Sequence, residues 1–475
     1  MTVYSPITDA IRAKLESTLG KGNVIFDRDA IRDYSHDEYS LDDVRHFPEV
    51  VVKPESTEQV SAIMKIAHEN QFAVTPRGGG TGLVGGCIPV MGGAVLSLER
   101  MNSIIEIDKE NRMAVAEAGI TLMDFYSAVE DAGLFFPPHP GDESAFLGGA
   151  IATNAGGARA VKYGVMRDFV RGLTAVLADG SILHLGGKTL KNCSGYPLIQ
   201  LITGSEGTLA IITEAIIRLS PTPQNMLTLL VPYQRLSDAI ATVPDILSHG
   251  IVPISIEFIQ HGVIAPTERL IGMRWPSKNG QAYLMFIVDG PSEDEVFRLS
   301  ELIGDICLTH HSGEVLVAEE REKQREILAI RSNIYEGLKP NTIEILDLTV
   351  PITQISPHIA RVGEIAAEYG IWLPSYGHAA DGNIHTHIMK LREEKDGLVR
   401  LTEEDWKQKY PLVRRLLHED CIARGGVISG EHCVGLVKKE YLSLALSDKH
   451  LEMMGAVKKA FDEKMILNPG KIFDV

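Results

Sequence analysis

The apolar positions of the first 220 residues fall into short runs that are separated by glycine turns. A helix is predicted over residues 57–70, because apolar residues such as Val60 and Ile63 repeat at helical spacing. Runs such as EVVVKP, GAVLSL and RMAVAEAG predict β-strands, with a second helix near residues 121–132. This part of the chain therefore predicts a domain made mostly of strands.

The pattern changes after residue 221. Longer apolar runs (LTLLVPY, ISIEFI, AYLMFIVDG, TIEILDLTVP) alternate with amphipathic segments such as PSEDEVFRLSELIGDI and ISPHIARVGEIAAEYG. This alternation predicts an α+β domain with an antiparallel sheet. The charged stretch LREEKDGLVRLTEEDWKQKYPLVRRLLHEDCIA predicts a helix, and it leads to a C-terminal piece that ends in ILNPGKIF.

The stretch PRGGGTGLVGG, residues 76–86, spells G-x-G-x-x-G within its six glycines. That pattern marks a dinucleotide site only where a strand ends and a helix begins. Here FAVT predicts a strand before the loop, but Pro89, Gly92 and Gly93 interrupt any helix after it, and another strand is predicted from Ala94. We therefore expect the loop to join strand to strand, without the βαβ unit of an NAD fold.

Glycine at this density still needs a physical reason, because each glycine costs backbone entropy. A row of backbone N–H groups suits a phosphate. The alternative is a flexible surface linker, which the apolar residues Val84, Ile88 and Val90 disfavour because linkers are usually polar. We therefore interpret the loop as a phosphate-binding segment.

Length, charge and cysteine content narrow the class of protein. A chain of 475 residues suits two or three domains, and its net charge of −17 opposes binding to nucleic acid or to anionic membranes. The five cysteines form no C-x-x-C pair, so neither a disulfide framework nor an iron–sulfur site is indicated. No apolar run reaches the roughly 18 residues of a membrane span, and a cytoplasmic location is expected.

Two further clusters of small residues follow, PPHPGDESAFLGGAIATNAGGARAVKYG at 137–164 and TGSEGTLAIITEAII at 203–217. Together with PRGGGTG and ILNPGKIF, they resemble the FAD-binding domain of the vanillyl-alcohol oxidase superfamily over nearly the whole chain. The most similar branch is that of the FAD-linked D-2-hydroxyacid dehydrogenases, which includes D-lactate dehydrogenase, the glycolate oxidase flavoprotein subunit and D-2-hydroxyglutarate dehydrogenase.

The resemblance implies an α+β protein with a two-subdomain FAD-binding domain at 1–221, an α+β cap domain for substrate at 222–420, and a C-terminal segment at 421–475 that returns to the FAD domain. Some superfamily members attach FAD through a histidine of the first glycine loop. The loop here has none, so noncovalent FAD is expected.

The resemblance also implies that the first loop holds the FAD pyrophosphate and that the other two clusters surround the rest of the cofactor. The FAD-binding residues implied are Pro76, Arg77, Gly78, Gly79, Gly80, Thr81, Gly82, Gly85, Gly86, Pro140, Gly141, Gly148, Gly149, Ala152, Thr153, Asn154, Gly156, Gly157, Tyr163, Gly164, Glu206, Gly207, Ile211 and Ile212.

The segment YGHAADGNIHTHI, residues 376–388, concentrates three histidines around a predicted hairpin turn. His385 and His387 share a strand face, and His378 lies across the hairpin. A divalent metal needs two or three imidazoles and a carboxylate, which Glu431 of SGEHCVG could supply. For any one histidine, a surface position on a polar turn is the alternative.

Family motifs GHxxDGNxH and GEH imply that the metal ligands correspond to His378, His385 and Glu431, and that His432 is the catalytic base. His387 differs from the D-2-hydroxyglutarate enzymes and is expected to bear on substrate size. Zinc is the first choice of metal, with iron or manganese as alternatives.

A 2-hydroxy acid carries a carboxylate, and arginine binds carboxylates in bidentate geometry. Arg331 lies in a helix-like run where the family places its carboxylate-binding arginine, although an exposed ion-paired arginine is the alternative. The hypothesis is that Arg331 anchors the substrate, the metal lowers the pKa of the α-hydroxyl, His432 accepts its proton, and the Cα hydrogen passes to FAD as hydride. D-lactate oxidation to pyruvate is the expected reaction.

The chain has no cluster-binding cysteines, so the electrons must leave through a separate protein. Relatives in the family use electron-transferring flavoprotein, among other acceptors. The alternatives are oxidation of glycolate or D-2-hydroxyglutarate, a non-redox flavoenzyme resembling alkyl-dihydroxyacetone-phosphate synthase, and a subunit that binds FAD without turning over substrate.

Overall fold

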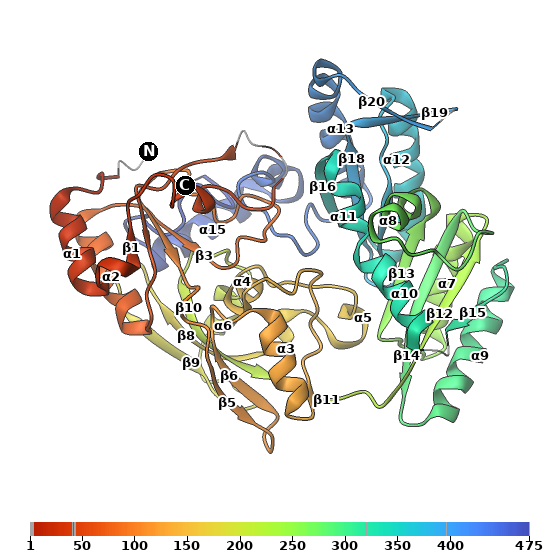
Figure 1. Ribbon diagram of the computed structural model, residues 1–475, viewed down its shortest axis with the longest axis horizontal. Helices are drawn as coiled ribbons and strands as arrows, with labels where there is room; N and C mark the ends of the chain where they lie inside the picture. Colours follow the sequence, from red (N-terminus) through yellow and green to blue (C-terminus); the bar gives the residue numbers. More distant parts are fainter. Residues whose placement is uncertain (1–3, 40, 42–43, 319–320, 396, 475) are drawn as a thin grey trace. The chain divides into compact units, whose positions relative to one another are not determined.

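The computed structural model describes residues 4–39, 41, 44–318, 321–395 and 397–474. They form two compact units (Figure 1). Unit 1 comprises residues 1–156, 165–222 and 431–475, and unit 2 comprises residues 157–164 and 223–430. Among the described residues, no helix combines the length and the apolar character that a membrane span requires.

Unit 1 is built around two sheets. Its helices are α1 (Asp9–Leu19), α2 (Thr57–Asn70), α3 (Leu122–Asp131), α4 (Leu147–Ala152), α6 (Leu198–Ile202), α14 (Leu442–Ala445) and α15 (Asp448–Phe461). Its strands are β1 (Val24–Ile25), β2 (Val50–Val52), β3 (Val74–Arg77), β4 (Ala94–Ser97), β5 (Ile104–Asp108), β6 (Met113–Glu117), β7 (Leu134–Phe135), β8 (Val170–Val176), β9 (Ile182–Gly186), β10 (Ile211–Arg218) and β11 (Ser220–Pro221). The predicted helix at 57–70 is confirmed.

The helix α2 begins where its sequence predicts. The Ser56 side chain accepts a hydrogen bond from the Gln59 amide at 3.3 Å, which caps the first turn. In a capping box, the Gln59 side chain would accept from the Ser56 amide. Here it accepts from the Glu55 amide instead. Val60, Ile63 and Met64 are fully buried, so the predicted apolar face packs into the core.

The strand order is β1-β2-β4-β3 in the smaller sheet and β5-β6-β10-β8-β9 in the larger one, which is antiparallel throughout. The glycine loop joins β3 to β4 with no helix between residues 78 and 93, as predicted. The two strands are nevertheless parallel neighbours, which the sequence did not indicate. A crossover between parallel strands usually contains a helix, and here an irregular loop replaces it.

The C-terminal segment completes the smaller sheet of unit 1. The Val74 amide donates to the Ile466 carbonyl at 2.8 Å, and the Asn468 amide donates to the Val74 carbonyl at 2.7 Å. The Asn468 side-chain amide also donates to the Gly86 and Glu206 carbonyls, at 3.0 and 2.7 Å. One buried side chain of the ILNPGKIF stretch therefore ties the first glycine loop to the third.

Unit 2 is a single antiparallel sheet with helices, with the strand order β15-β12-β14-β13-β17-β18-β16, and a separate hairpin. Its helices are α5 (Ala160–Tyr163), α7 (Leu236–Ser248), α8 (Ile264–Ile271), α9 (Glu293–Thr309), α10 (Arg321–Ser332), α11 (Ile334–Leu338), α12 (Ile355–Tyr369) and α13 (Glu403–Ala423). Its strands are β12 (Asn225–Tyr233), β13 (Ser255–Gln260), β14 (Ala282–Gly290), β15 (Leu316–Ala318), β16 (Thr342–Thr349), β17 (Ser375–His378), β18 (Asn383–Met389), β19 (Leu391–Glu394) and β20 (Gly397–Arg400). The predicted α+β class with an antiparallel sheet is confirmed.

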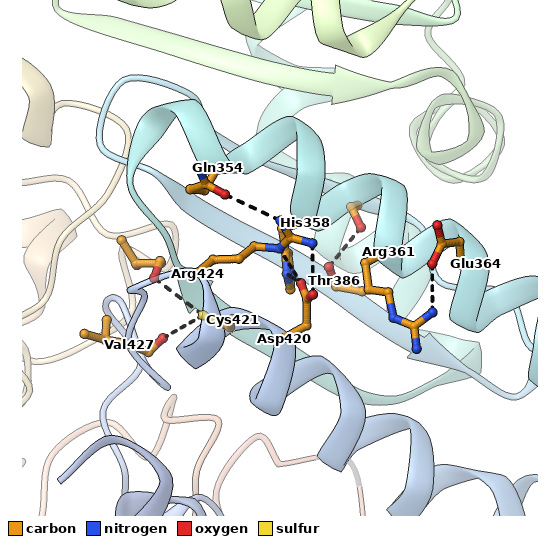
Figure 2. A network of polar contacts seen from close by, with 11 residues as sticks. Gln354, His358, Arg361, Glu364, Thr386, Asp420, Cys421, Arg424 and Val427 are labelled. Carbon is orange, nitrogen blue, oxygen red and sulfur yellow. Dashed lines mark hydrogen bonds and ion pairs between the residues drawn. The ribbon is translucent and has the colours of Figure 1, made fainter.

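The helices α12 and α13 are fixed to each other by the polar network of Figure 2. The buried His358 ring contacts the Asp420 carboxylate through Nδ1 at 2.7 Å, and Arg424 binds the same carboxylate through Nε and Nη2. Arg424 also donates to the Gln354 side chain through Nη1, so it connects the end of α13 to the start of α12. These bonds lower the pKa of Asp420 although partial burial opposes the charged form.

One predicted helix is partly wrong. Residues 391–394 and 397–400 form the paired strands β19 and β20, and the helix begins only at Glu403. The reason lies in Gly397, which has φ +125° and pairs opposite Glu394 at the hairpin end. Glycine adopts such positive φ values without strain, and an Asp-Gly pair favours a hairpin turn over a continuous helix.

The contacts of Asn468 lead to a stability prediction. Asn468→Ala should destabilise unit 1 by about 1 to 3 kcal/mol, because the buried Glu206 carbonyl and the partly buried Gly86 carbonyl lose this donor. Asn70→Ala is a matched control, since the Asn70 side chain donates to the Ile66 carbonyl within its own helix end. Hydrogen exchange of residues 76–86 and 203–212 should accelerate in Asn468→Ala alone. Equal exchange in both variants would contradict the role of Asn468.

Candidate functional site

The first and second glycine clusters lie against each other in unit 1. A Cβ atom added to Gly78 would lie 3.6 Å from the Gly149 Cα, and one added to Gly79 would lie 3.1 Å from the Ser144 carbonyl oxygen. Within the first loop, Gly80 and Gly85 have φ values of +75° and +73°, which favour glycine. The backbones of the two predicted clusters therefore lie close together at these glycines, which fits a phosphate-bearing cofactor.

The third cluster joins this arrangement through Glu206. Its amide donates to the Ala152 carbonyl at 2.8 Å, and its buried carboxylate accepts from the amides of Val434 and Gly435 at 3.0 and 2.7 Å. Burial raises the pKa of Glu206, although these amides and nearby lysines favour its charged form. Glu206 thus joins three segments, the second cluster through its backbone amide and residues 434–435 through its carboxylate.

The implied FAD-binding residues are divided between the two units. Those from Pro76 to Gly156, together with Glu206, Gly207, Ile211 and Ile212, belong to unit 1. Gly157, Tyr163 and Gly164 belong to unit 2, where α5 packs near β13 and Lys162 forms an ion pair with Asp289. The individual contacts with the cofactor stay predictions.

Two of the predicted metal ligands meet in unit 2. In the hairpin of β17 and β18, Tyr376 lies opposite His385 and His378 lies opposite Asn383. The His378 and His385 rings are perpendicular, with centroids 5.3 Å apart, and a nitrogen of one lies within 4.8 Å of a nitrogen of the other. Both side chains are buried, so the surface-histidine alternative does not describe them.

A carboxylate that sequence reasoning missed orients His378. Glu257, on β13, is fully buried and contacts His378 Nδ1 through Oε1 at 2.7 Å. This contact directs His378 Nε2 away from Glu257, toward any ligand on the other side of the ring. The only sequence signal was an acidic residue inside the apolar run ISIEFI.

Glu257 also binds Arg331, which lies in the last turn of α10. Arg331 donates to Glu257 Oε2 through Nε at 2.7 Å and through Nη2. Burial alone would raise the pKa of Glu257, but Arg331 and His378 lower it to about 2. Because Glu257 uses the Nε and Nη2 side of the guanidinium, a substrate carboxylate would have to use the Nη1 and Nη2 end.

The ring of Tyr376 lies close to both Arg331 and His385. Its centroid is 5.0 Å from the Arg331 guanidinium carbon and 5.3 Å from the His385 centroid. His387 is fully buried. Its Nε2 lies 3.3 Å from the Tyr376 hydroxyl, and its Nδ1 lies 2.8 Å from the Thr342 hydroxyl. The predicted influence of His387 on substrate size stays a prediction.

A second carboxylate missed from the sequence lies beside His385. Asp347, opposite His385 on β16, is fully buried and has an oxygen within 4.8 Å of a His385 nitrogen. It accepts hydrogen bonds from the Asn383 side chain at 2.7 Å, from the Ser429 hydroxyl at 2.9 Å and from the Gly430 amide at 3.0 Å. Asp347 therefore fixes the end of the unit 2 chain immediately before Glu431.

Glu431 and His432 belong to unit 1. Their side chains are partly exposed, and His432 Nε2 lies 3.7 Å from Glu431 Oε1. A Cβ added to Gly156 would lie 3.0 Å from Glu431 Oε2, so the second glycine cluster approaches the GEH segment within this unit. The metal-ligand role of Glu431 and the base role of His432 stay predictions.

Two family models match the chain. The FAD binding domain family covers residues 48–186, and the C-terminal domain family of FAD linked oxidases covers residues 222–472. The chain belongs to the FAD-linked oxidases. The resemblance based on the glycine clusters and ILNPGKIF is thereby confirmed, and the protein is an FAD-linked oxidoreductase.

Three relatives match over most of their length. A D-lactate dehydrogenase of Archaeoglobus fulgidus is 44% identical and covers 89% of this chain and 91% of its own. A D-lactate dehydrogenase of Anaerostipes hadrus is 37% identical, covering 99% and 98% respectively. The glycolate oxidase subunit GlcD of Bacillus subtilis is 38% identical, covering 93% and 92%.

Solved structures confirm the vanillyl-alcohol oxidase type of fold for this FAD-linked oxidase. p-Cresol methylhydroxylase with bound substrate aligns with a TM-score of 0.79 at 17% identity, over 100% of this chain and 99% of its own. Alkyldihydroxyacetonephosphate synthase aligns with a TM-score of 0.77 at 20% identity, over 99% and 87%. At such identities the likeness establishes the fold alone.

The contacts of Glu257 lead to a second stability prediction. Glu257→Gln should destabilise unit 2 by about 3 to 5 kcal/mol, because Arg331 would stay largely buried without a charged partner. Glu295→Gln is the control, since Glu295 pairs with Arg298 on the exposed face of α9 and should contribute at most about 1 kcal/mol. Urea unfolding can be followed through Trp275, Trp372 and Trp406, which all lie in unit 2. Equal unfolding midpoints would contradict this role.

Proposed function

We propose that this FAD-linked oxidase removes two electrons from a D-2-hydroxy acid and that D-lactate, giving pyruvate, is its substrate. The observation that carries the proposal is the buried Glu257 carboxylate, which holds an arginine and a histidine side by side. An arginine suits the carboxylate of a hydroxy acid, and a histidine pair suits a metal near its hydroxyl. Two of the three relatives described above are named D-lactate dehydrogenase.

Arg331 binds the substrate carboxylate in this proposal. Glu257 holds the guanidinium from one side and the Tyr376 ring lies over it, so Arg331 is fixed before substrate arrives. A fixed arginine loses little side-chain freedom on binding, which favours affinity. The cost of burying its charge is offset by Glu257.

His378 and His385 hold a divalent metal, with Glu431 as the carboxylate ligand expected from the sequence. When bound, the metal supplies Lewis acidity toward the α-hydroxyl and noncovalent FAD supplies the hydride acceptor. Two imidazoles and a carboxylate suit zinc best, with iron or manganese as alternatives. Glu257 fixes the ring orientation of His378 through Nδ1.

His432 accepts the proton of the α-hydroxyl. The reaction then balances, because His432 takes the hydroxyl proton, the Cα hydrogen leaves with its bonding electron pair as a hydride that bound FAD would accept, and the C–O single bond becomes the carbonyl of the 2-oxo acid. A histidine suits this step because its ordinary pKa lies near neutral pH.

An anaerobic reduction screen tests the function. D-lactate should bleach the flavin absorbance within minutes, whereas L-lactate should not. Glycolate and D-2-hydroxyglutarate are the runner-up substrates, the former because of the relative named glycolate oxidase subunit. Reduction by none of these acids would leave a non-redox flavoenzyme or a carrier subunit as the function.

The electrons pass to a partner protein such as electron-transferring flavoprotein, and a cytoplasmic location is part of the proposal. The net charge of −17 favours a partner with a basic docking face. With D-lactate, the isolated protein should reduce artificial dyes but not NAD, and electron-transferring flavoprotein should be reduced in its presence. Rapid NAD reduction by the isolated chain would refute this acceptor.

Arg331→Lys tests the carboxylate anchor. The lysine keeps the charge but loses the planar fork, so about 1.5 to 3 kcal/mol of substrate binding should be lost. The kcat/KM for D-lactate should fall by one to two orders of magnitude, roughly. Arg325→Lys, at an exposed position of the same helix, is the control and should change neither substrate nor FAD binding. Unchanged kinetics in Arg331→Lys would remove Arg331 from the site.

The metal is tested by His378→Ala combined with His385→Ala. Elemental analysis should show loss of a stoichiometric metal, and D-lactate oxidation should cease while FAD stays bound. His261→Ala, at an exposed position of unit 2, should retain both metal and activity. Full activity of a wild-type preparation that is free of metal would refute the metal.

A further inference from the structure

A short segment before the matched FAD-binding region lies against the first glycine loop. We call residues 33–38 the N-terminal brace. The Glu38 amide donates to the Gly82 carbonyl at 2.9 Å, and the Gly85 amide donates to Asp37 Oδ2 at 2.7 Å. The brace therefore holds both ends of the Gly82–Gly85 stretch.

Arg77 ties the brace to the start of the loop. It is nearly buried at the end of β3, and its guanidinium donates to the His36 carbonyl at 2.6 Å and to the Asp33 carbonyl at 3.0 Å. A Cβ added to Gly80 would lie 2.1 Å from Arg77 Nη2. The Arg77 side chain thus passes directly over the loop to reach the brace.

The Asp37 side chain uses its two oxygens for two different amides. Oδ2 accepts from Gly85, and Oδ1 accepts from Tyr39 at 3.1 Å. Burial raises the pKa of Asp37 to about 6, and the charge of Arg77 opposes that rise. Lys471 also lies near Asp37, and burial lowers the pKa of its ammonium group to about 8. Asp37 is therefore charged at pH 8, and Arg77 supplies the opposite charge.

We propose that Asp37 is a positioning residue for FAD, because it fixes the Gly85 amide and so sets the shape of the first glycine loop. The family match begins at residue 48, so the brace lies outside the matched FAD-binding region. The Gly85 amide donates to Asp37, so the amides that donate hydrogen bonds to the FAD phosphates are those that precede Gly85 in the loop. The inference rests on FAD binding and not on the choice of substrate.

Asp37→Asn tests this assignment, because asparagine keeps the shape of the side chain but has only one carbonyl oxygen for two amide donors. Asp27→Asn is a matched control. Asp27 accepts from the amides of Asp29 and Ala30 through one oxygen, Oδ1, so an asparagine can keep both bonds. The full-length protein is stripped of FAD and titrated with FAD at pH 8 while flavin fluorescence is measured.

The Kd for FAD should rise at least tenfold in Asp37→Asn and stay within twofold of wild type in Asp27→Asn. In the FAD-free protein, hydrogen exchange should accelerate in residues 78–88 and not in residues 203–212. A general loss of stability would accelerate both segments, so this comparison separates positioning from a merely structural role.

A Kd within twofold of wild type in folded Asp37→Asn would overturn the assignment, as would equal acceleration of both segments. If Asp37→Asn does not fold, Asp37→Glu is titrated instead. Its carboxylate keeps both acceptors but is displaced by one methylene, and the Kd should again rise at least tenfold. Failure of both variants to fold would show that Asp37 is needed for folding and would overturn the positioning role.

Discussion

The buried Glu206 carboxylate is the constraint on which the arrangement of unit 1 depends. A buried charge without partners is very costly, and the Glu206 carboxylate accepts hydrogen bonds from the amides of Val434 and Gly435. Asn468 donates to the backbone carbonyl of the same residue. The Glu206 backbone has φ +54°, a conformation that few side chains adopt readily. Glu206 is therefore compatible with few arrangements of the glycine clusters and the C-terminal segment other than the one observed.

Unit 2 uses the same physical principle twice. Glu257 joins the end of α10 to the β17–β18 hairpin, and Asp347 joins that hairpin to Ser429 and Gly430. In each case, two or more charged or amide donors offset the desolvation cost of a carboxylate inside an apolar strand. The side chains that suit chemistry, Arg331 and His378, are both oriented by Glu257 rather than by the strands alone.

Local features of the fold could be predicted from the sequence. The helix at 57–70 and the hairpin that brings His378 beside His385 depend on residues within a few positions of each other. The buried carboxylates could not be predicted, because their partners are distant in the chain: Arg331 is 74 residues from Glu257, and Gly85 is 48 residues from Asp37. An isolated acid in an apolar run is visible in a sequence, but its partner is not.

The parallel pairing of β3 with β4 was missed for a related reason. The rule that a crossover contains a helix is statistical, and a rigid loop can replace the helix if its backbone is held. Here Asp37 and Glu38 hold the loop from one side, and Asn468 holds it at Gly86. No local pattern in residues 76–93 carries that information.

The glycines themselves can now be sorted by what each one avoids. Gly80 avoids the Arg77 side chain, Gly207 avoids Pro76 at 2.8 Å, and Gly435 avoids the Val84 carbonyl oxygen at 2.2 Å, so the chain itself requires them. Gly149 differs, because a Cβ built there has no described atom within 4 Å outside its own helix. Packing within the described chain does not require a glycine at Gly149, whereas close approach of a phosphate to the backbone would. The glycine-rich segments therefore mix glycines that the folded chain itself requires with a position, Gly149, that it does not, and only the second kind informs on the ligand.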